Sequence, residues 1–210
     1  MKINNPQYIT FYIDENFEYI LTQIYRCYEK MLVDYEFVEN NENKIKNRLF
    51  KDYLDNQDIK EELELTEFLF ATENASLDDN YNEKGYADIQ VYDLLKYKKD
   101  TQAYYVIECK RLDDINPNYQ NSLNNKYIKE GIQRYIDEKY KTNFSINGML
   151  AFVVKMNDIE INCQHFADFT PYKFIDNLDF SYRSNHTTKS NKKFTLYHLM
   201  LDFRSKISSN

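Results

Sequence analysis

Two stretches decide the fold of this chain: Gly85-Tyr86-Ala87-Asp88-Ile89-Gln90-Val91 and Tyr104-Tyr105-Val106-Ile107-Glu108-Cys109-Lys110. Both are rich in β-branched and aromatic residues, and a short polar segment, residues 96–101, separates them. This pattern predicts a β-hairpin. The second stretch is apolar on both faces up to Ile107, which is typical of a central strand that is covered on both sides.

Three charged residues occupy strand positions that should be apolar: Asp88, Glu108 and Lys110. Burying a charge costs several kcal/mol unless the charge is paired or binds a metal. Residues i and i+2 of a strand share a face, so Glu108 and Lys110 should point the same way and Cys109 the opposite way. A turn centred near residue 98 would place Asp88 directly opposite Glu108.

Two carboxylates at that separation repel each other unless one is protonated or a cation lies between them. Mg²⁺ takes one or two carboxylates together with waters and substrate phosphate oxygens. The hairpin therefore predicts a Mg²⁺ or Mn²⁺ site formed by Asp88 and Glu108, with Lys110 placed to orient an attacking water. The alternative is a charged strand end, in which Glu-x-Lys is an ordinary solvated pair.

Apolar spacing predicts the other elements. Helices are expected at 15–33, about 40–55 and about 123–140, with a short helix within 158–180. Strands are expected at 148–154 and 194–203, and residues 62–70 are ambiguous but are read as a first strand. Residues 113–122 and the polar run 184–193 are read as loops. No linker rich in Gly, Pro or Ser divides the 210 residues, so a single domain is expected.

Composition excludes several classes of protein. With 3 Gly in the chain there is no Gly-rich phosphate-binding loop. No apolar run is long enough to span a bilayer, so we expect no membrane partner. The three cysteines, Cys27, Cys109 and Cys163, are odd in number and far apart. They predict free thiols in a reducing cytoplasm rather than a disulfide framework or a zinc site.

The net charge of −7 is unevenly distributed. Residues 1–80 carry 8 basic and 18 acidic side chains, whereas residues 171–210 carry 7 basic and 3 acidic ones. Binding a polyanion requires a local basic surface rather than a basic average. The basic C-terminal segment is therefore a candidate nucleic-acid surface and the acidic N-terminal region a candidate surface for a protein partner. Both could equally be solvated faces.

The order of these features resembles the PD-(D/E)XK phosphodiesterase superfamily. The matching segments are Glu42-Asn43-Lys44-Ile45 on a helix, Tyr86-Ala87-Asp88-Ile89 on a strand, Glu108-Cys109-Lys110 on the next strand, and the helix 127–135 that carries Gln133. The resemblance covers residues of about 40–155, and Ala87 stands where the literal motif has proline. It implies an α/β fold with a restriction-endonuclease-like core, a central mixed β-sheet flanked by helices, a helical N-terminal extension and a basic C-terminal segment.

The resemblance also implies roles for residues. Asp88 and Glu108 would bind the metal, Lys110 would be the catalytic lysine, and Gln133 would be a supporting polar residue beside the metal. Glu42 would be an accessory carboxylate, although Glu39 lies one turn away and a first-turn glutamate also favours a helix N-terminus.

The implied activity is Mg²⁺-dependent hydrolysis of DNA phosphodiesters, in a bacterial restriction or anti-phage role. Whether the substrate is DNA or RNA and whether the chain forms a homodimer stay open. One alternative is a catalytically silent module that binds a partner protein. The other is a metal-dependent hydrolase of small nucleotides, which would need an enclosed pocket.

Basic residues of the 123–141 helix and of the 183–193 loop are expected to flank the metal site and bind phosphates. His186 could donate to a phosphate oxygen or assist protonation of the leaving group. The candidates for nucleic-acid contacts are Lys126, Lys129, Arg134, Arg183, His186, Lys192 and Lys193.

Overall fold

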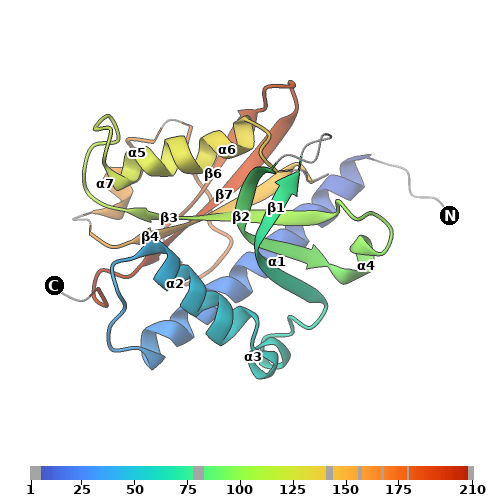
Figure 1. Cartoon of the computed structure of the whole chain (residues 1–210), viewed down its shortest axis with the longest axis horizontal. Coiled ribbons are helices and arrows are strands. Elements are labelled where there is room, and N and C mark those ends of the chain that lie inside the picture. Colours follow the sequence, from blue (N-terminus) through green and yellow to red (C-terminus); the bar gives the residue numbers. More distant parts are fainter. Residues whose placement is uncertain are drawn as a thin grey trace.

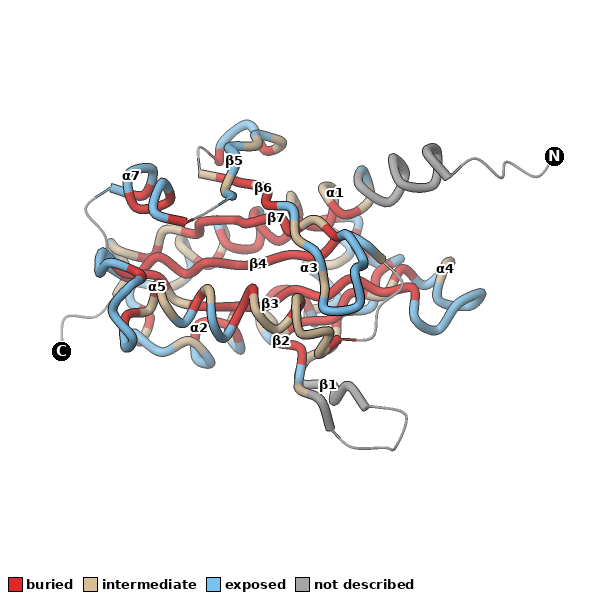
Figure 2. Tube along the Cα trace, turned by 90° about the horizontal axis from the view of Figure 1, so that it is seen from above, coloured by how far each residue is buried: buried red, intermediate tan, exposed pale blue. Residues whose placement is uncertain are grey.

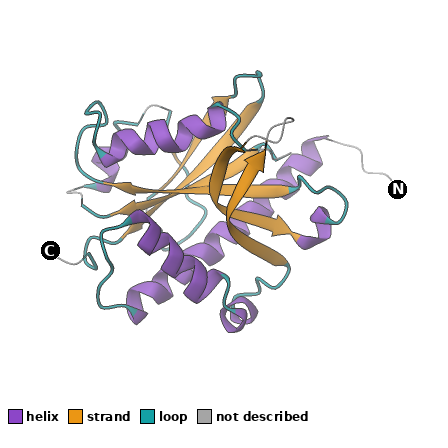
Figure 3. Ribbon diagram, viewed as in Figure 1, coloured by secondary structure: helices purple, strands orange, loops and turns teal. Residues whose placement is uncertain are grey.

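A seven-stranded β-sheet with helices on both faces forms the protein (Figures 1 and 3). The computed structural model describes residues 6–77, 83–140, 144–155, 158–166, 168–178 and 180–207. The helices are α1 (Pro6–Asp34), α2 (Glu42–Arg48), α3 (Gln57–Glu62), α4 (Leu94–Tyr97), α5 (Leu123–Lys126), α6 (Gln133–Ile136) and α7 (Ile159–Cys163), with π-helical turns η1 (Leu49–Leu54) after α2 and η2 (Tyr127–Ile132) between α5 and α6. The strands are β1 (Phe68–Leu77), β2 (Glu83–Asp93), β3 (Tyr104–Leu112), β4 (Ile146–Val153), β5 (Thr170–Pro171), β6 (Ser181–Thr187) and β7 (Lys193–Asp202).

The order of the strands in the sheet is β1-β2-β3-β4-β7-β6-β5. The three central strands, β3, β4 and β7, are parallel, and the pairs on either side of them are antiparallel. A crossover through α5, η2 and α6 joins β3 to β4, as parallel neighbours require. Figure 2 shows that these central strands are buried along most of their length. The predicted class, an α/β fold with a central mixed sheet flanked by helices, is confirmed.

The hairpin forms with the expected register. Ile89 pairs with Ile107 and Val91 with Tyr105, so the turn is centred where the sequence predicted. The paired ladder runs from Tyr92 back to Ile89, so Asp88, the residue before Ile89, lies just outside it rather than in a direct pair with Glu108 as the sequence predicted. Ile89 packs in the core cluster under α1, whereas Ala87 packs in the cluster under α5 and α6. The alternation of β2 therefore changes at Asp88.

The N-terminal helix is longer than predicted and belongs to the core. It begins at Pro6 rather than near residue 15, and Phe17 stacks on Tyr105 of β3 at a ring-centroid distance of 4.6 Å. A Cβ atom on Gly148 of β4 would lie 2.9 Å from Cζ of Phe17, so glycine is needed for α1 to approach the sheet this closely. The expected helical N-terminal extension therefore packs on one face of the sheet as part of the core.

Several predicted boundaries hold and others are wrong. Strands 148–154 and 194–203 are confirmed as β4 and β7, and α7 is the expected short helix. The predicted strand at 62–70 is wrong in its first half, because α3 extends to Glu62 and β1 begins at Phe68. The predicted helix 123–140 ends at Ile136.

The polar run 184–193 is not wholly a loop, because residues 181–187 form β6 against β7. Ser184 of this strand is buried in the sheet, where its hydroxyl lies 2.7 Å from Nε2 of His198. The polar residues of this segment led to the prediction of a loop where the structure has a strand.

All three cysteines are buried and free, as predicted. Among the described helices, none has the length and apolar character that crossing a membrane would require.

Candidate active site

Three carboxylates from three different elements surround one ammonium group. Nζ of Lys110 lies 3.0 Å from Glu42 of α2, 3.3 Å from Glu108 of β3 and 3.8 Å from Asp88 of β2. The structure thus brings together the four residues at which the sequence placed the metal ligands and the catalytic lysine. The alternative carboxylate, Glu39, forms ion pairs with Arg48 and Lys44.

Glu42 is held in place by local structure and by the sheet. It is the first residue of α2, whose N-cap is Asn41, and the Asn41 side chain accepts a hydrogen bond from the backbone N–H of Lys44. Its Oε2 accepts the backbone N–H of Arg111 at 3.0 Å. This bond joins α2 to β3 and fixes the carboxylate that reaches Lys110.

Asp88 is held at the end of the hairpin ladder. Its Oδ2 accepts the backbone N–H of Cys109 at 2.8 Å. The side chain of Asp88 therefore accepts a hydrogen bond from the backbone of β3 at the point where the regular pairing of β2 and β3 stops. Because that donor belongs to the neighbour of Glu108, the bond keeps the two carboxylates of the hairpin close together.

Glu108 is completely buried, and every partner in the site acts on its protonation. Oε1 accepts from Nη1 of Arg134 at 2.7 Å, and Oε2 accepts the phenol of Tyr140. Burial raises the pKa of Glu108 to about 7; the negative charge of Asp88 adds to this rise, and Lys110, Arg134 and the Tyr140 hydrogen bond oppose it.

Lys110 remains charged at neutral pH. Burial by itself would lower its pKa, but the charges of Glu108, Glu42 and Asp88 outweigh burial and raise it. Its ammonium also donates to the carbonyl oxygen of Cys109 at 2.9 Å. The lysine is thus a fixed positive charge at the point where the three carboxylates meet.

The site contains a second lysine, Lys46, which the sequence analysis did not identify. Lys46 is 2% exposed, and its Nζ lies 3.1 Å from Oδ1 of Asp88. It follows Glu42 by four residues on the same helix, and residues with that spacing share a helix face. The sequence shows the spacing of Glu42 and Lys46, but it does not show that this face of α2 is buried.

Gln133 does not contact the site carboxylates, contrary to its expected place beside the metal. Its amide donates to Asp137 at 3.0 Å, and its neighbour Arg134 contacts Glu108 instead. The approach of this helix depends on Gly131, because a Cβ there would lie 2.6 Å from Cε of Met149 and 3.5 Å from Cγ of Lys110. Arg134, expected to bind phosphate, is therefore in part a partner of Glu108.

Arg183 lies on the other face of the sheet. Its guanidinium stacks over the rings of Tyr172 and Tyr197, 3.8 and 4.2 Å from their centroids, and it pairs with Glu18 of α1 at 3.5 Å. Tyr197 belongs to the core cluster under α1, away from the helix that carries Arg134. The expectation that Arg183 flanks the metal site is wrong.

His186 and the lysines of the β6–β7 turn are also displaced from the site. His186 is hydrogen-bonded to the hydroxyl of Ser184. The same hydroxyl is hydrogen-bonded to His198, whose other ring nitrogen is hydrogen-bonded to the phenol of Tyr127. Lys193 precedes His198 by five residues, and His198 lies level with Glu108 across β4. At about 3.3 Å per residue, Lys193 is about 17 Å away along the sheet.

Lys192 directly precedes Lys193 in the same turn, so it is also distant from the site. Lys126 and Lys129 are exposed on the segment that leads to Arg134.

The donors at this site suit a hard divalent cation, because carboxylate oxygens are the ligands that Mg²⁺ and Mn²⁺ prefer. Within the described part of the chain, no three His, Cys, Asp or Glu side chains form a ready metal cage. Instead the ammonium of Lys110 occupies the centre of the carboxylates. Glu42, Asp88 and Glu108 are the residues that would hold a metal ion.

Comparisons with known proteins identify no relative of this chain. No protein-family model matches it, and neither a curated protein nor a solved structure matches. Inferences about its activity therefore rest on the residues and geometry of the site.

The raised pKa of Glu108 predicts how stability depends on pH. Between its ordinary value of 4.5 and about 7, the folded state keeps a proton that the unfolded state has lost. Unfolding then releases a proton, so the stabilisation is complete below pH 4.5 and is lost as pH rises through 7, by an amount on the order of 3 kcal/mol.

Melting in chelator at a series of pH values should show this slope in the wild type. The slope should be absent from Glu108→Gln, which cannot titrate. Equal slopes for the two proteins would show that Glu108 ionises as it would in water.

Proposed function

We propose that this protein is a Mg²⁺- or Mn²⁺-dependent nuclease of the PD-(D/E)XK type that hydrolyses DNA phosphodiesters. The observation that carries the proposal is the convergence of Glu42, Asp88 and Glu108 around Lys110 at the end of a buried hairpin. Buried charges of this kind are costly, and costly polar groups gather at functional sites. The order of these residues along the chain also supports the proposal, because a glutamate on a helix, an aspartate on a strand and Glu-x-Lys on the next strand resemble the PD-(D/E)XK pattern.

The chemistry divides between the metal and the side chains. When bound, Mg²⁺ would polarise the scissile phosphate and make water a stronger nucleophile at neutral pH. Glu42, Asp88 and Glu108 would hold the ion, and Lys110 would orient the attacking water and balance negative charge that develops on the phosphate. Arg134 is 33% exposed, so its guanidinium can reach a phosphate oxygen while Nη1 stays on Glu108.

A polymeric substrate suits the partly open edge of this site, where the side chain of Glu42 is 29% exposed and that of Arg134 is 33% exposed. Three pockets in the described part of the chain have volumes of about 730, 480 and 360 Å³, and these three are lined by other residues. The wider role that we infer, cleavage of invading DNA in a bacterial cell, rests on the resemblance.

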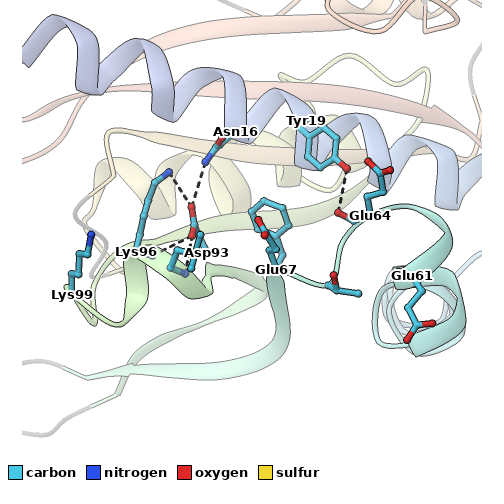
Figure 4. Close-up of a pocket in the computed structure, with 11 residues that line it drawn as sticks. Asn16, Tyr19, Glu61, Glu64, Glu67, Asp93, Lys96 and Lys99 are labelled. Carbon is cyan, nitrogen blue, oxygen red and sulfur yellow. Dashed lines mark hydrogen bonds and ion pairs between the residues drawn. The ribbon is translucent and has the colours of Figure 1, made fainter.

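A second candidate function, binding of a partner protein, is favoured by the position of the largest of these pockets. Other residues than the site carboxylates line it: Glu61, Glu64, Glu67 and Asp93 outnumber the two lysines of its lining, Lys96 and Lys99 (Figure 4). Asp93 at its wall is already held by Asn16 and Lys96. A basic segment of a partner would suit such a rim, whether or not the carboxylate site is active.

The test is incubation of the purified protein with supercoiled plasmid, linear duplex, single-stranded DNA and RNA, in Mg²⁺, Mn²⁺ or EDTA. We expect cleavage of DNA with either metal, none in EDTA, and none by Glu108→Gln. Cleavage that survives EDTA or the Glu108→Gln substitution would place the activity elsewhere. Absence of cleavage on every substrate would favour the partner-binding module.

A further inference from the structure

We propose that Lys46 is a built-in counter-ion of the site, and that its ammonium limits the site to one divalent metal ion. The inference deepens the proposed function and rests on it. It concerns how many ions bind, whereas the proposed function concerns what the site does, so the two can fail separately.

Among the described residues, three cationic side chains contact the three carboxylates of the site: Lys46, Lys110 and Arg134. Once ionised as metal ligands, Glu42, Asp88 and Glu108 carry three negative charges, which these three cations balance. One divalent ion would give the site a charge of about +2, and two would give about +4. Charges of one sign repel strongly in a poorly solvated site, so a second ion would bind at a large electrostatic disadvantage.

Lys46 is the cation that cannot move aside. Its side chain is 2% exposed, whereas that of Arg134 is 33% exposed. Its neighbour Ile45 and Leu49, one turn further on, are both completely buried in the core under α1. Arg134 can turn towards solvent or a phosphate when a metal arrives, but the ammonium of Lys46 stays beside Asp88.

Asp88 is also poorly suited to bridge two ions. Two-metal sites hold their ions about 3.5–4 Å apart, a distance that a carboxylate can span with one oxygen on each ion. Oδ1 of Asp88 contacts Lys46 at 3.1 Å, and Oδ2 accepts the N–H of Cys109 at 2.8 Å. Lys46 therefore takes the side of Asp88 that a second ion would need.

The test is Mn²⁺ binding to the full-length protein, measured by calorimetry and by electron paramagnetic resonance. We expect the wild type to bind one Mn²⁺ with the signal of an isolated ion. Lys46→Met, which keeps the length of the side chain without its charge, should bind a second ion at least about tenfold more tightly than the wild type does. Two ions in this variant should show spin coupling.

Lys44→Met is the matched control, since Lys44 is on the same helix but 62% exposed, and its stoichiometry should stay at one. Circular dichroism checks that each variant folds, and Lys46→Gln replaces Lys46→Met if it does not. Two ions bound with similar affinity by the wild type would overturn the inference, as would a stoichiometry of one in folded Lys46 variants. One ion bound without cleavage of any nucleic acid would instead overturn the proposed function, and no ion bound would overturn both.

Discussion

Replacing Asp88 by alanine is expected to abolish cleavage and to destabilise the metal-free protein. Asp88 is a candidate metal ligand and also the carboxylate that contacts the buried ammonium of Lys46 at 3.1 Å. The substitution takes this contact away from a buried ammonium, and breaking a buried ion pair in this way costs about 3–5 kcal/mol. For a protein of this size, this should lower the melting temperature by on the order of 10 °C.

Two variants make this prediction specific. The double variant Asp88→Ala, Lys46→Met removes both charges, so it should recover much of the lost stability in chelator but none of the cleavage. Glu39→Ala, which changes the neighbouring half-exposed carboxylate that pairs with Arg48, should leave cleavage unchanged. Normal cleavage by folded Asp88→Ala would rule out Asp88 as a ligand, and unchanged stability would show that its contact with Lys46 contributes little.

Replacing Lys110 by alanine is expected to stop turnover while strengthening metal binding. A lysine is not a metal ligand, and its ammonium lies within 3.0–3.8 Å of all three carboxylates, where it competes with a bound cation. Loss of the group that orients the nucleophile should reduce the rate by about 10²–10⁴-fold. Loss of the competing charge should tighten Mn²⁺ binding, by about tenfold or more.

Calorimetry and a cleavage assay in the same buffer would measure both effects. Lys126→Ala is a suitable control, because Lys126 is exposed on α5, and it should retain metal binding and the chemical step. If folded Lys110→Ala fails to bind Mn²⁺, the lysine organises the carboxylates rather than competing for them. If it cleaves at the wild-type rate, Lys110 has no part in the reaction.

Most of the residues that the sequence misplaced have a partner that is distant in the chain, although His186 bonds to Ser184, two residues away, and reaches His198 only through it. Arg183 and His186 read as members of a basic loop, yet β6 directs one under α1 and the other to Ser184 and His198. Lys46 looks like a solvated helix residue until α2 packs against the sheet. Arg134 reads as a phosphate ligand, but it contacts Glu108, which lies 26 residues earlier.

The sequence by itself determined the hairpin, its register, and the shared face of Glu108 and Lys110. These follow from local rules, since strands alternate with a period of two and a short turn fixes which residues pair. Only the tertiary structure decided that Glu42 rather than Glu39 joins the carboxylates, that Lys46, Arg134 and Tyr140 contact them, and that Arg183 pairs with Glu18 instead. The physical reason is that burial and ion pairing depend on how helices dock on the sheet, which is set by apolar packing over the whole chain rather than by charges near in sequence.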